Sequence, residues 1–543
     1  LVPDNIKPVA VVYHGISDTI PAHLKQLSGR VYPGNSPILS RLLTLGAIAY
    51  SKTATLPANL QGVALVGESD MPTFVVAASN ASAAAKARAD YVCDGVADDV
   101  QIQAAIDALP AAGGKVLLSE GTFTLAAKIN TGTKSGFVIQ GSGRQATIIT
   151  LANGVNDDVI LMGDSVAYCP NITIADLTID GNSAQQTAGS GVNANGIENL
   201  IIRNVEITDC KQYGILSAGA PARHSVYLQV RGCYINTDTL SGIYLLNDSY
   251  GAVIEGNIIA GNGKTAAECG VRINNNSDHT IVGNIFDENS YGITSYLGLY
   301  VTVTGNMFLN QERDAVFDYT GGNDGKHWAV VGNTIISPSN GAVGTYNGIR
   351  TDGQYWTISD NVIYALANAI DSGIKELAGA NFNVITGNNL RGTFNGAGVT
   401  AVGAETIVHS NQGYLAPGEH RIASGALTAG LVNTYAFNWQ NPHATKILIK
   451  RVLIYLSAAG GTATAVLDVG KATATATHDD TLIDGLNINQ VGVFDNLNDA
   501  GTNGKSRQIV DENGGTNDWV TGQILVEAAS SLAGRYEIEY VGI

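Results

Sequence analysis

An imperfect repeat in the middle third of the chain constrains its fold more than any other feature. Between about Asn199 and Asn389, a Gly-Asn step or a close equivalent recurs at intervals of 22 to 28 residues. The asparagines of these steps are Asn257, Asn284, Asn306, Asn333, Asn361 and Asn388. A period of this length predicts a coil in which each turn of the chain stacks on the turn before it.

A second motif, a small residue followed by a β-branched one, runs out of phase with the first. Its β-branched members are Ile215, Ile243, Val271, Ile293, Val316, Ile349 and Ile370. Apolar and polar residues alternate within each short segment, which predicts parallel strands with one face turned inward. The expected inward column is Ile254, Ile281, Val303, Val330, Ile358 and Ile385. We expect the asparagine after each glycine to form a ladder of side-chain amides in a turn.

Composition narrows the classes of protein that remain. Of the 543 residues, 45% are hydrophobic and 14% are charged, which favours a large core. A net charge of −17 disfavours nucleic-acid binding, and no apolar run reaches the roughly 18 residues of a membrane span. The five cysteines fit no zinc pattern, so we expect buried free thiols, no metal centre and no cofactor. Because the chain begins at Leu1, it is expected to be a fragment or a processed form.

The two ends of the chain lack the repeat. Prolines punctuate short apolar pieces in residues 1–88, where one helix is expected over residues 36–51, and we expect a small N-terminal attachment domain. The repeat has stopped by about Gly413, and residues 413–543 contain alternating segments that predict an antiparallel β-sandwich. The predicted organisation is all-β, with an N-terminal domain (1–88), a parallel β-helix (89–412) and a C-terminal β-sandwich (413–543).

The segment that leads into the repeat predicts an amphipathic helix with Asp98 and Asp99 at its start, where carboxylates cap free amides. It resembles the start of pectate-lyase-like β-helix proteins, and phage tailspikes in particular. The matching residues are Asp94, Gly95, Asp98, Asp99, Ala104, Ala105, Ile106, Gly113, Gly114, Gly121 and Phe123.

This resemblance implies a right-handed parallel β-helix whose N-terminal end is covered by the helix. It also implies a homotrimer in a virion tail, joined to the phage tail or baseplate through its N-terminal region. Such a protein acts outside the host cell on a bacterial surface polysaccharide, O-antigen or capsule. In that family a C-terminal module like residues 413–543 helps to form the trimer or binds sugar.

Counting from the small residue of each repeat places a strip of side chains on the outer face of the coil. The first outward column is Tyr244, Arg272, Thr294, Phe317, Arg350 and Asp371, and the second is Leu246, Asn274, Tyr296, Tyr319 and Asp352. Rungs about 4.8 Å apart would join these columns into one continuous surface. Aromatic faces stack on sugar rings, and arginine binds carboxylates in a bidentate manner, so the strip suits an extended saccharide.

Two reactions are open for this strip. A lyase would use Arg272 or Arg350 to neutralise a uronate carboxylate and Tyr296 or Tyr319 to move the proton. A hydrolase would use two carboxylates, Asp318 or Asp352 with one further carboxylate from Asp371, Asp314 or Glu268. Asp318 falls at an inward position, so it must lie at a bend or in a partly buried site that raises its pKa.

The candidate catalytic residues are therefore Arg272, Tyr296, Asp318, Arg350 and Asp352. The candidate substrate-binding residues are Tyr244, Asn274, Phe317, Tyr319 and Asp371. The sequence favours a polysaccharide depolymerase, with the lyase slightly ahead of the endo-glycosidase. The alternatives are a secreted bacterial polysaccharide lyase or epimerase with the same coil, and a receptor-binding fibre without catalysis.

Overall fold

A computed structural model describes residues 9–10, 31–32, 71–163, 169–220, 223–264, 268–319, 325–461, 464–475 and 477–543. The chain divides into two compact units, Leu1–Asp70 and Met71–Ile543. In the first unit, β1 (Val9–Ala10) pairs with β2 (Val31–Tyr32) in antiparallel fashion. The helix expected over residues 36–51 lies outside the described residues.

The second unit begins with β3 (Thr73–Ala77), which already belongs to the coil because it pairs in parallel with β5 (Gly114–Leu118). Between them lie α3 (Ala83–Lys86), β4 (Tyr91–Val92) and α4 (Asp99–Ala108). The boundary predicted at 88/89 is therefore wrong, and the division falls at 70/71 instead. Sequence reasoning missed it because β3 precedes the first recognisable repeat.

Helix α4 forms where the amphipathic pattern predicted it and buries Ile102, Ala105 and Ile106 in the core of the coil. The predicted capping role of Asp98 is wrong, since its side chain makes no bond to the helix. Its carboxylate accepts the backbone N–H groups of Gly95 (2.7 Å) and Thr124 (2.8 Å) instead. Asp98 thus joins the helix to the strand that follows β5, and the Asp99 carboxylate likewise accepts the N–H of Ala126.

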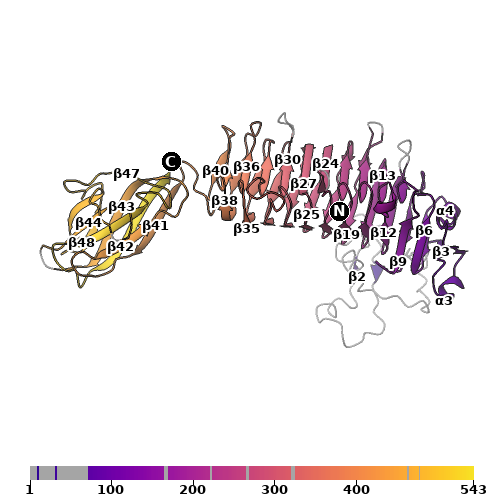
Figure 1. Cartoon of the computed structure of the whole chain (residues 1–543), viewed down its shortest axis with the longest axis horizontal. Helices are drawn as coiled ribbons and strands as arrows, with labels where there is room; N and C mark the ends of the chain where they lie inside the picture. The colour runs from indigo at the N-terminus through magenta and orange to yellow at the C-terminus, as the bar shows by residue number, and fades with distance from the viewer. Residues whose placement is uncertain are drawn as a thin grey trace. The chain divides into compact units, whose positions relative to one another are not determined.

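The coil is built from two parallel sheets (Figure 1). Besides β3, β4 and β5, the 27-stranded sheet contains β7 (Ile129–Asn130), β8 (Phe137–Gln140), β10 (Ile160–Met162), β11 (Cys169–Ala175), β13 (Val192–Asn195), β14 (Ile197–Arg203), β16 (Ile215–Ala218), β17 (Ser225–Val226), β18 (Gln229–Arg231), β20 (Ile243–Leu246), β21 (Ser249–Tyr250), β22 (Val253–Glu255), β24 (Cys269–Ser277), β25 (Thr280–Val282), β27 (Tyr291–Leu299), β28 (Thr302–Thr304), β30 (Val316–Asp318), β31 (Ala329–Val331), β33 (Ile349–Thr351), β34 (Thr357–Ser359), β36 (Ile374–Glu376), β37 (Val384–Thr386), β39 (Val399–Thr400) and β40 (Ile407–His409).

The 11-stranded sheet contains β6 (Gly121–Leu125), β9 (Thr147–Leu151), β12 (Thr178–Asp180), β15 (Glu206–Thr208), β19 (Tyr234–Asn236), β23 (Ile258–Ala260), β26 (Ile285–Asp287), β29 (Met307–Leu309), β32 (Thr334–Ile336), β35 (Val362–Ile370) and β38 (Asn389–Phe394). A short 3₁₀ helix spans Ser183–Gln185. A typical rung uses three strands, such as β20, β22 and β23, which pair with β24, β25 and β26 of the next rung. This arrangement is the right-handed parallel β-helix that the sequence predicted.

Both predicted ladders are confirmed. The column from Ile254 to Ile385 is in register from rung to rung, and each of its six members is fully buried. The asparagine ladder runs from Asn257 to Asn388, with side-chain bonds of 2.9–3.0 Å, and continues to Asn411. These amides hydrogen-bond one another where water is excluded, so the turn repeats identically at each rung.

The C-terminal region forms the predicted antiparallel sandwich, and it begins after β40 at β41 (His420–Ala426). One sheet contains β41, β49 (Ala533–Gly542), β43 (Ile447–Ala458) and β46 (Gly492–Asp495), with β47 (Gln508–Val510) beside β43. The other contains β42 (Tyr435–Gln440), β48 (Trp519–Leu525), β44 (Val466–Ala472) and β45 (Ile483–Asn487). Between the sheets lies a separate apolar core that includes Val452, Leu467 and Ile524.

All five cysteines are buried, as predicted. Within the described residues, no helix has the length and apolar character needed to cross a membrane.

Candidate functional site

The first outward column is in register along five strands of the coil. Tyr244 pairs with Arg272, Arg272 with Thr294, Thr294 with Phe317 and Phe317 with Arg350. We call the outer surface of β20, β24, β27, β30 and β33 the outward strip. The strip is a single surface because five consecutive rungs keep the same register.

The sixth member predicted for this column, Asp371, is misplaced. Arg350 pairs with Lys375, because Ile349 pairs with Ile374 rather than with Ile370. Ile370 is the last residue of the long strand β35 in the other sheet. Asp371 still lies near the strip, since its carboxylate forms an ion pair with Lys375 at 2.6 Å.

The second column supplies the exposed aromatic surface. Asn274 pairs with Tyr296, and the backbone N–H of Tyr319 continues the ladder to Ser295 O. The side chains of Tyr296 and Tyr319 are each 40% exposed, and their ring centroids are 5.7 Å apart. Asn274 Nδ2 donates to Tyr244 Oη at 2.9 Å. The rings of Tyr296 and Tyr319 are therefore partly exposed on adjacent rungs, and the Asn274 amide lies one rung before Tyr296.

Tyr244 is not an open platform, because only 6% of it is exposed. Tyr213 packs against its ring at 4.9 Å, and the Arg272 guanidinium lies over the ring at 4.9 Å. Arg272 Nη1 also binds Glu268 Oε1 at 2.5 Å. Burial lowers the pKa of Arg272, but the Glu268 carboxylate more than offsets this and leaves the pKa above its usual value. Arg272 is therefore a fixed cation.

A second cluster of the same kind surrounds Arg350. Its guanidinium lies 3.6 Å from the centroid of Phe317, and Nη2 binds Asp314 Oδ2 at 2.7 Å. Asp314 is fully buried, and its other oxygen accepts both the backbone N–H and the Nδ2 of Asn347. Burial raises the pKa of Asp314, while Arg350 and Asn347 oppose the rise. Phe317 in turn stacks on Tyr319 at 5.2 Å, so this cluster adjoins the exposed tyrosines.

Asp318 lies behind the strip and is fully buried, which confirms that it is inward-facing. Burial, with a smaller contribution from the nearby Asp352 carboxylate, raises its pKa from 3.8 to about 7, although the hydroxyl of Ser295 lowers it. Neither carboxyl oxygen has a well-formed hydrogen bond among the described residues. A Cβ atom on Gly325 would lie 2.2 Å from Asp318 Oδ2, so the backbone of Gly325 closes directly over this carboxyl group.

Asp352 is 8% exposed and accepts the backbone N–H of Gly379 at 2.7 Å. Its own backbone N–H donates to Asp318 O, which places the two acidic residues on adjacent rungs. With a pKa of about 7, Asp318 is partly protonated near neutral pH, and it lies beside the carboxyl group of Asp352.

The polar interior around Asp318 is absent from the two rungs that precede Ser295. Its column contains Ser295 and Asp318, whereas the two rungs before Ser295 carry Leu245 and Ile273. Trp328 and Trp356 stack nearby inside the coil, with centroids 4.6 Å apart and planes at 1°. Trp356 Nε1 donates to Gly325 O, and both Trp356 Nε1 and Asp318 Oδ2 lie against Gly353.

Sequence reasoning missed an exposed stack of rings at one corner of the coil. Its members are Tyr300, His327, Tyr355 and Phe382, with successive centroids 5.0–5.1 Å apart and planes within 4–11° of parallel. All four residues have φ between 53° and 60°. Their spacing of 27 or 28 residues was visible in the sequence. Because the rings cover each other's faces, a ligand would meet mainly their edges.

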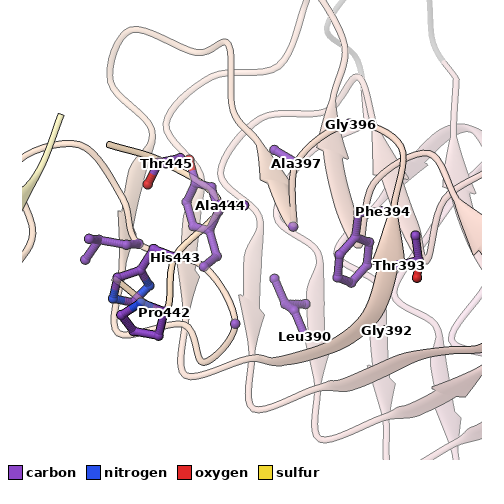
Figure 2. A pocket seen from close by; sticks show the side chains of 14 residues that line it. Leu390, Gly392, Thr393, Phe394, Gly396, Ala397, Pro442, His443, Ala444 and Thr445 are labelled. Atoms are coloured by element: carbon purple, nitrogen blue, oxygen red, sulfur yellow. The ribbon is translucent and has the colours of Figure 1, made fainter. Parts of the chain in front are cut away.

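A separate pocket lies at the C-terminal end of the coil (Figure 2). Leu390 and Phe394 line it from β38, and residues 442–445 line it from the sandwich. Burial lowers the pKa of His443 there, and no carboxylate is among its lining residues. The pocket therefore offers no acid–base pair comparable to Asp318 and Asp352. In the described part of the chain, the only group of three side chains spaced for a metal ion lies in the sandwich, not in the strip.

Comparison with known proteins matches residues 158–335 to the family model described as "Right handed beta helix region". No curated protein sequence matches the chain.

Solved structures with a similar fold include the A-module of the Azotobacter vinelandii mannuronan C-5 epimerase AlgE6, at 20% identity and a TM-score of 0.46 over 59% of this chain and 96% of that one. They also include pre-mature bacteriophage phi29 gene product 12, at 15% identity and a TM-score of 0.48 over 58% of this chain and 50% of that one. A third is the Dettilon tailspike protein, at 16% identity and a TM-score of 0.39 over 93% of this chain and 100% of that one.

The strand register and the family model lead to the same conclusion. The chain contains a right-handed β-helix region.

Proposed function

We propose that this protein is a phage tailspike that binds and depolymerises a bacterial surface polysaccharide along the outward strip. The observation that carries the proposal is the placement of two exposed tyrosines, Tyr296 and Tyr319, beside the acidic pair Asp318 and Asp352. The phage setting rests on the resemblance of the segment from Asp94 to Phe123 to tailspikes.

Sugar binding follows from the chemistry of the exposed groups. The faces of Tyr296 and Tyr319 present apolar area with a hydroxyl at one edge, a combination that suits pyranose rings. Asn274 adds an amide that can accept and donate hydrogen bonds one rung away. An extended polymer lying across the rungs would meet these groups in sequence.

Hydrolysis is the reaction that the acidic pair supports best. A glycosidase needs one protonated carboxyl group and one ionised carboxylate near the scissile bond. Asp318 is the group that holds a proton near neutral pH, and Asp352 is its carboxylate neighbour. In this scheme the acid donates its proton to the leaving glycosidic oxygen as the bond to the anomeric carbon breaks. Because Asp318 is fully buried, it can do so only for a substrate that reaches behind the outward strip. The carboxylate takes a proton from the attacking water.

β-Elimination, which the sequence slightly favoured, is the second candidate. It requires an arginine that is free to neutralise the carboxylate of a uronate. Arg272 is already bound to Glu268 at 2.5 Å and Arg350 to Asp314 at 2.7 Å, so a substrate carboxylate would have to share each cation. The exposed Tyr296 lies on the strand next to that of Arg272, where its hydroxyl could transfer the proton in a β-elimination.

We further propose that the protein assembles as a homotrimer, with its N-terminal region attached to the phage tail. An apolar stripe on the outer face of the 11-stranded sheet supports self-association. Its members are Ile258, Ile285, Met307, Val362, Tyr364 and Leu366, which are 36–59% exposed. Ile258, Ile285 and Met307 lie on three consecutive rungs, and Val362 follows two rungs after Met307, with Thr334 on the rung between them. Identical copies aligned in parallel would therefore match rung against rung.

The deciding experiment incubates the protein with capsule or O-antigen polysaccharide purified from candidate host strains. Shortened chains with new reducing ends and no ultraviolet absorbance from an unsaturated uronate would mark a hydrolase. The same shortening with that absorbance would mark a lyase. If the protein binds the polysaccharide of a strain but does not shorten it, the result would contradict the enzymatic proposal. It would support a receptor-binding fibre instead.

Asp352→Asn tests the acidic pair in the same assay, and we expect a loss of turnover of at least about 100-fold with binding retained. The matched control is Asp360→Asn, which removes the same charge from an exposed turn close by in the chain and keeps a residue type that tolerates its φ of 57°. Equal activity of both variants would place the chemistry elsewhere.

A further inference from the structure

We propose that the C-terminal sandwich binds one calcium ion on the outer face of its four-stranded sheet. The ligands are Asp468 on β44, Asp484 on β45 and Asp480 in the connection between these strands. One carboxylate oxygen from each residue lies within 4.8 Å of the other two. This site is independent of the outward strip and of the function proposed for it.

The spacing of these oxygens fits calcium. Calcium binds six to eight oxygen atoms at about 2.3–2.6 Å, so two ligands on opposite sides of one ion are at most about 5 Å apart. The three oxygens fall inside that limit. Magnesium needs nearly ideal octahedral geometry at about 2.0–2.1 Å, and three carboxylates on a strand pair and a loop do not favour it.

Each carboxylate is anchored through one oxygen by a donor at the site. Asp468 Oδ1 accepts the backbone N–H of Gly485 at 2.7 Å. Asn503 donates its Nδ2 to Asp480 Oδ2 at 2.8 Å and its backbone N–H to Asp484 Oδ2 at 3.0 Å. The second oxygen of each group is left for an ion.

The cluster also lacks a counter-charge from a lysine or an arginine among the described residues, since none of the three carboxylates forms an ion pair with such a side chain. Three carboxylates held this close repel one another, and a divalent cation would reverse the sign of that interaction.

A fourth ligand comes from an independent observation on the neighbouring strand. Gln523 on β48 lies directly opposite Asp468, so both side chains leave the same face of the sheet. Gln523 is 94% buried, because only 6% of it is exposed, and its Oε1 has no hydrogen-bond partner among the described residues.

The hydrogen bonding of the Gln523 amide leaves its oxygen without a donor. Its Nε2 donates to Asn433 O, just before β42, the strand that flanks β48 on the other side. This bond does not use Oε1, so the amide oxygen is available to an ion that Asp468 holds across the strand pair. A buried amide oxygen without a donor costs free energy, and coordination to calcium would satisfy it.

The experiment uses the full chain after treatment with EGTA. Titration calorimetry with calcium chloride should show one ion bound per chain. Thermal unfolding should shift upward by roughly 5–10 °C at a calcium concentration about 100 times Kd. Magnesium chloride at the same ionic strength should give a clearly smaller shift. No heat and no shift with calcium would overturn the proposal, and equal shifts with both ions would overturn the assignment to calcium.

The variants Asp468→Asn and Asp484→Asn show whether these residues bind calcium or only stabilise the fold. Each removes a repelling charge, so in EGTA the variant should unfold at or above the temperature of the wild-type protein. In calcium it should lose most of the upward shift. A merely structural role would instead lower the unfolding temperature by a similar amount in both buffers.

Two further variants sharpen the test. Asp479→Asn removes the same charge from the residue beside Asp480 but lies outside the cluster, so it should keep the calcium shift. Gln523→Met removes the amide oxygen while nearly conserving volume, so it should weaken calcium binding. If Gln523→Met binds calcium with wild-type affinity, Gln523 is not a ligand. If Asp468→Asn keeps the full rise in unfolding temperature with calcium, the proposed calcium site is wrong.

Discussion

Single residues decide how the outward strip behaves electrostatically. Arg272 and Arg350 are each held between an aromatic ring and a carboxylate, so they act as fixed cations rather than as mobile side chains. The sequence predicted that both arginines face outward, but their partners Glu268 and Asp314 come from connecting segments between strands. A periodic pattern places residues on strands and carries no information about which loop residue will fold back onto them.

Asp318 gives the sharpest prediction at this scale. Its pKa rises from 3.8 to about 7 on folding, so between these values the folded protein holds a proton that the unfolded chain has released. Its contribution to stability is therefore complete below about pH 4 and is lost as the pH rises through 7. We expect Asp318→Asn to remove this loss and to be more stable than wild type at pH 8, by on the order of 4 kcal/mol.

Urea unfolding at pH 4.5 and pH 8 would measure this effect. The difference between Asp318→Asn and wild type should be small at the lower pH and large at the higher one, while Asp360→Asn should show no such trend. A difference of the same size at both pH values would mean that Asp318 titrates near its ordinary pKa.

At the scale of strands and turns, sequence reasoning predicts those features correctly that repeat the same contact between neighbouring rungs. The inward isoleucines and the asparagine ladder were predictable because each rung repeats the same contact. The strand after β33 was misplaced because Ala369-Ile370 imitates the small-then-β-branched step. The true step is Gly373-Ile374, where a Cβ on Gly373 would lie 2.7 Å from Gly398 O.

Glycines at the corresponding positions make the same approach to the next rung. A Cβ on Gly214 would lie 2.6 Å from Gly242 O, and one on Gly348 would lie 2.6 Å from Gly373 O. Requiring glycine rather than any small residue would have identified the correct step here. Ala315 is the exception, since the alanine still fits one rung of this column.

Asn333 tests the ladder as an element. Its Oδ1 accepts both the backbone N–H and the Nδ2 of Asn306, and its Nδ2 donates to Asn361 Oδ1 and Val303 O. Asn333→Ala would leave several buried groups without partners, so we expect a loss of roughly 2–4 kcal/mol in the free energy of unfolding. Denaturant unfolding would measure it, with the exposed Asn489→Ala as control. A loss equal to that of the control would show that water replaces the missing amide.

At the scale of the whole molecule, the trimer proposal depends on the apolar stripe. Light scattering should give three chains per particle for the wild-type protein. The double variant Ile285→Lys with Met307→Lys should dissociate, because it places charges on adjacent rungs of the stripe. Its circular dichroism should remain that of an intact coil, since both side chains point outward.

Val343→Lys is the matched control for this test. It adds a charge at a side chain that is 58% exposed and lies outside the stripe, so the trimer should survive. A monomeric wild-type protein, or a trimer unaffected by the double variant, would contradict the stripe as the contact surface. The stripe was not predicted, because alternation in sequence does not distinguish an outward apolar residue that meets solvent from one that meets another chain.

The fluorescence of the stacked indoles of Trp328 and Trp356 reports on the interior of the coil. Trp356 and the Asp318 carboxyl group both lie against Gly353, so the charge that appears when Asp318 ionises falls beside a fluorophore. An indole changes its emission when a charge arises next to it in a medium of low dielectric constant. The protein therefore carries its own spectroscopic indicator for the protonation of one buried carboxyl group, in a place that no added dye could reach.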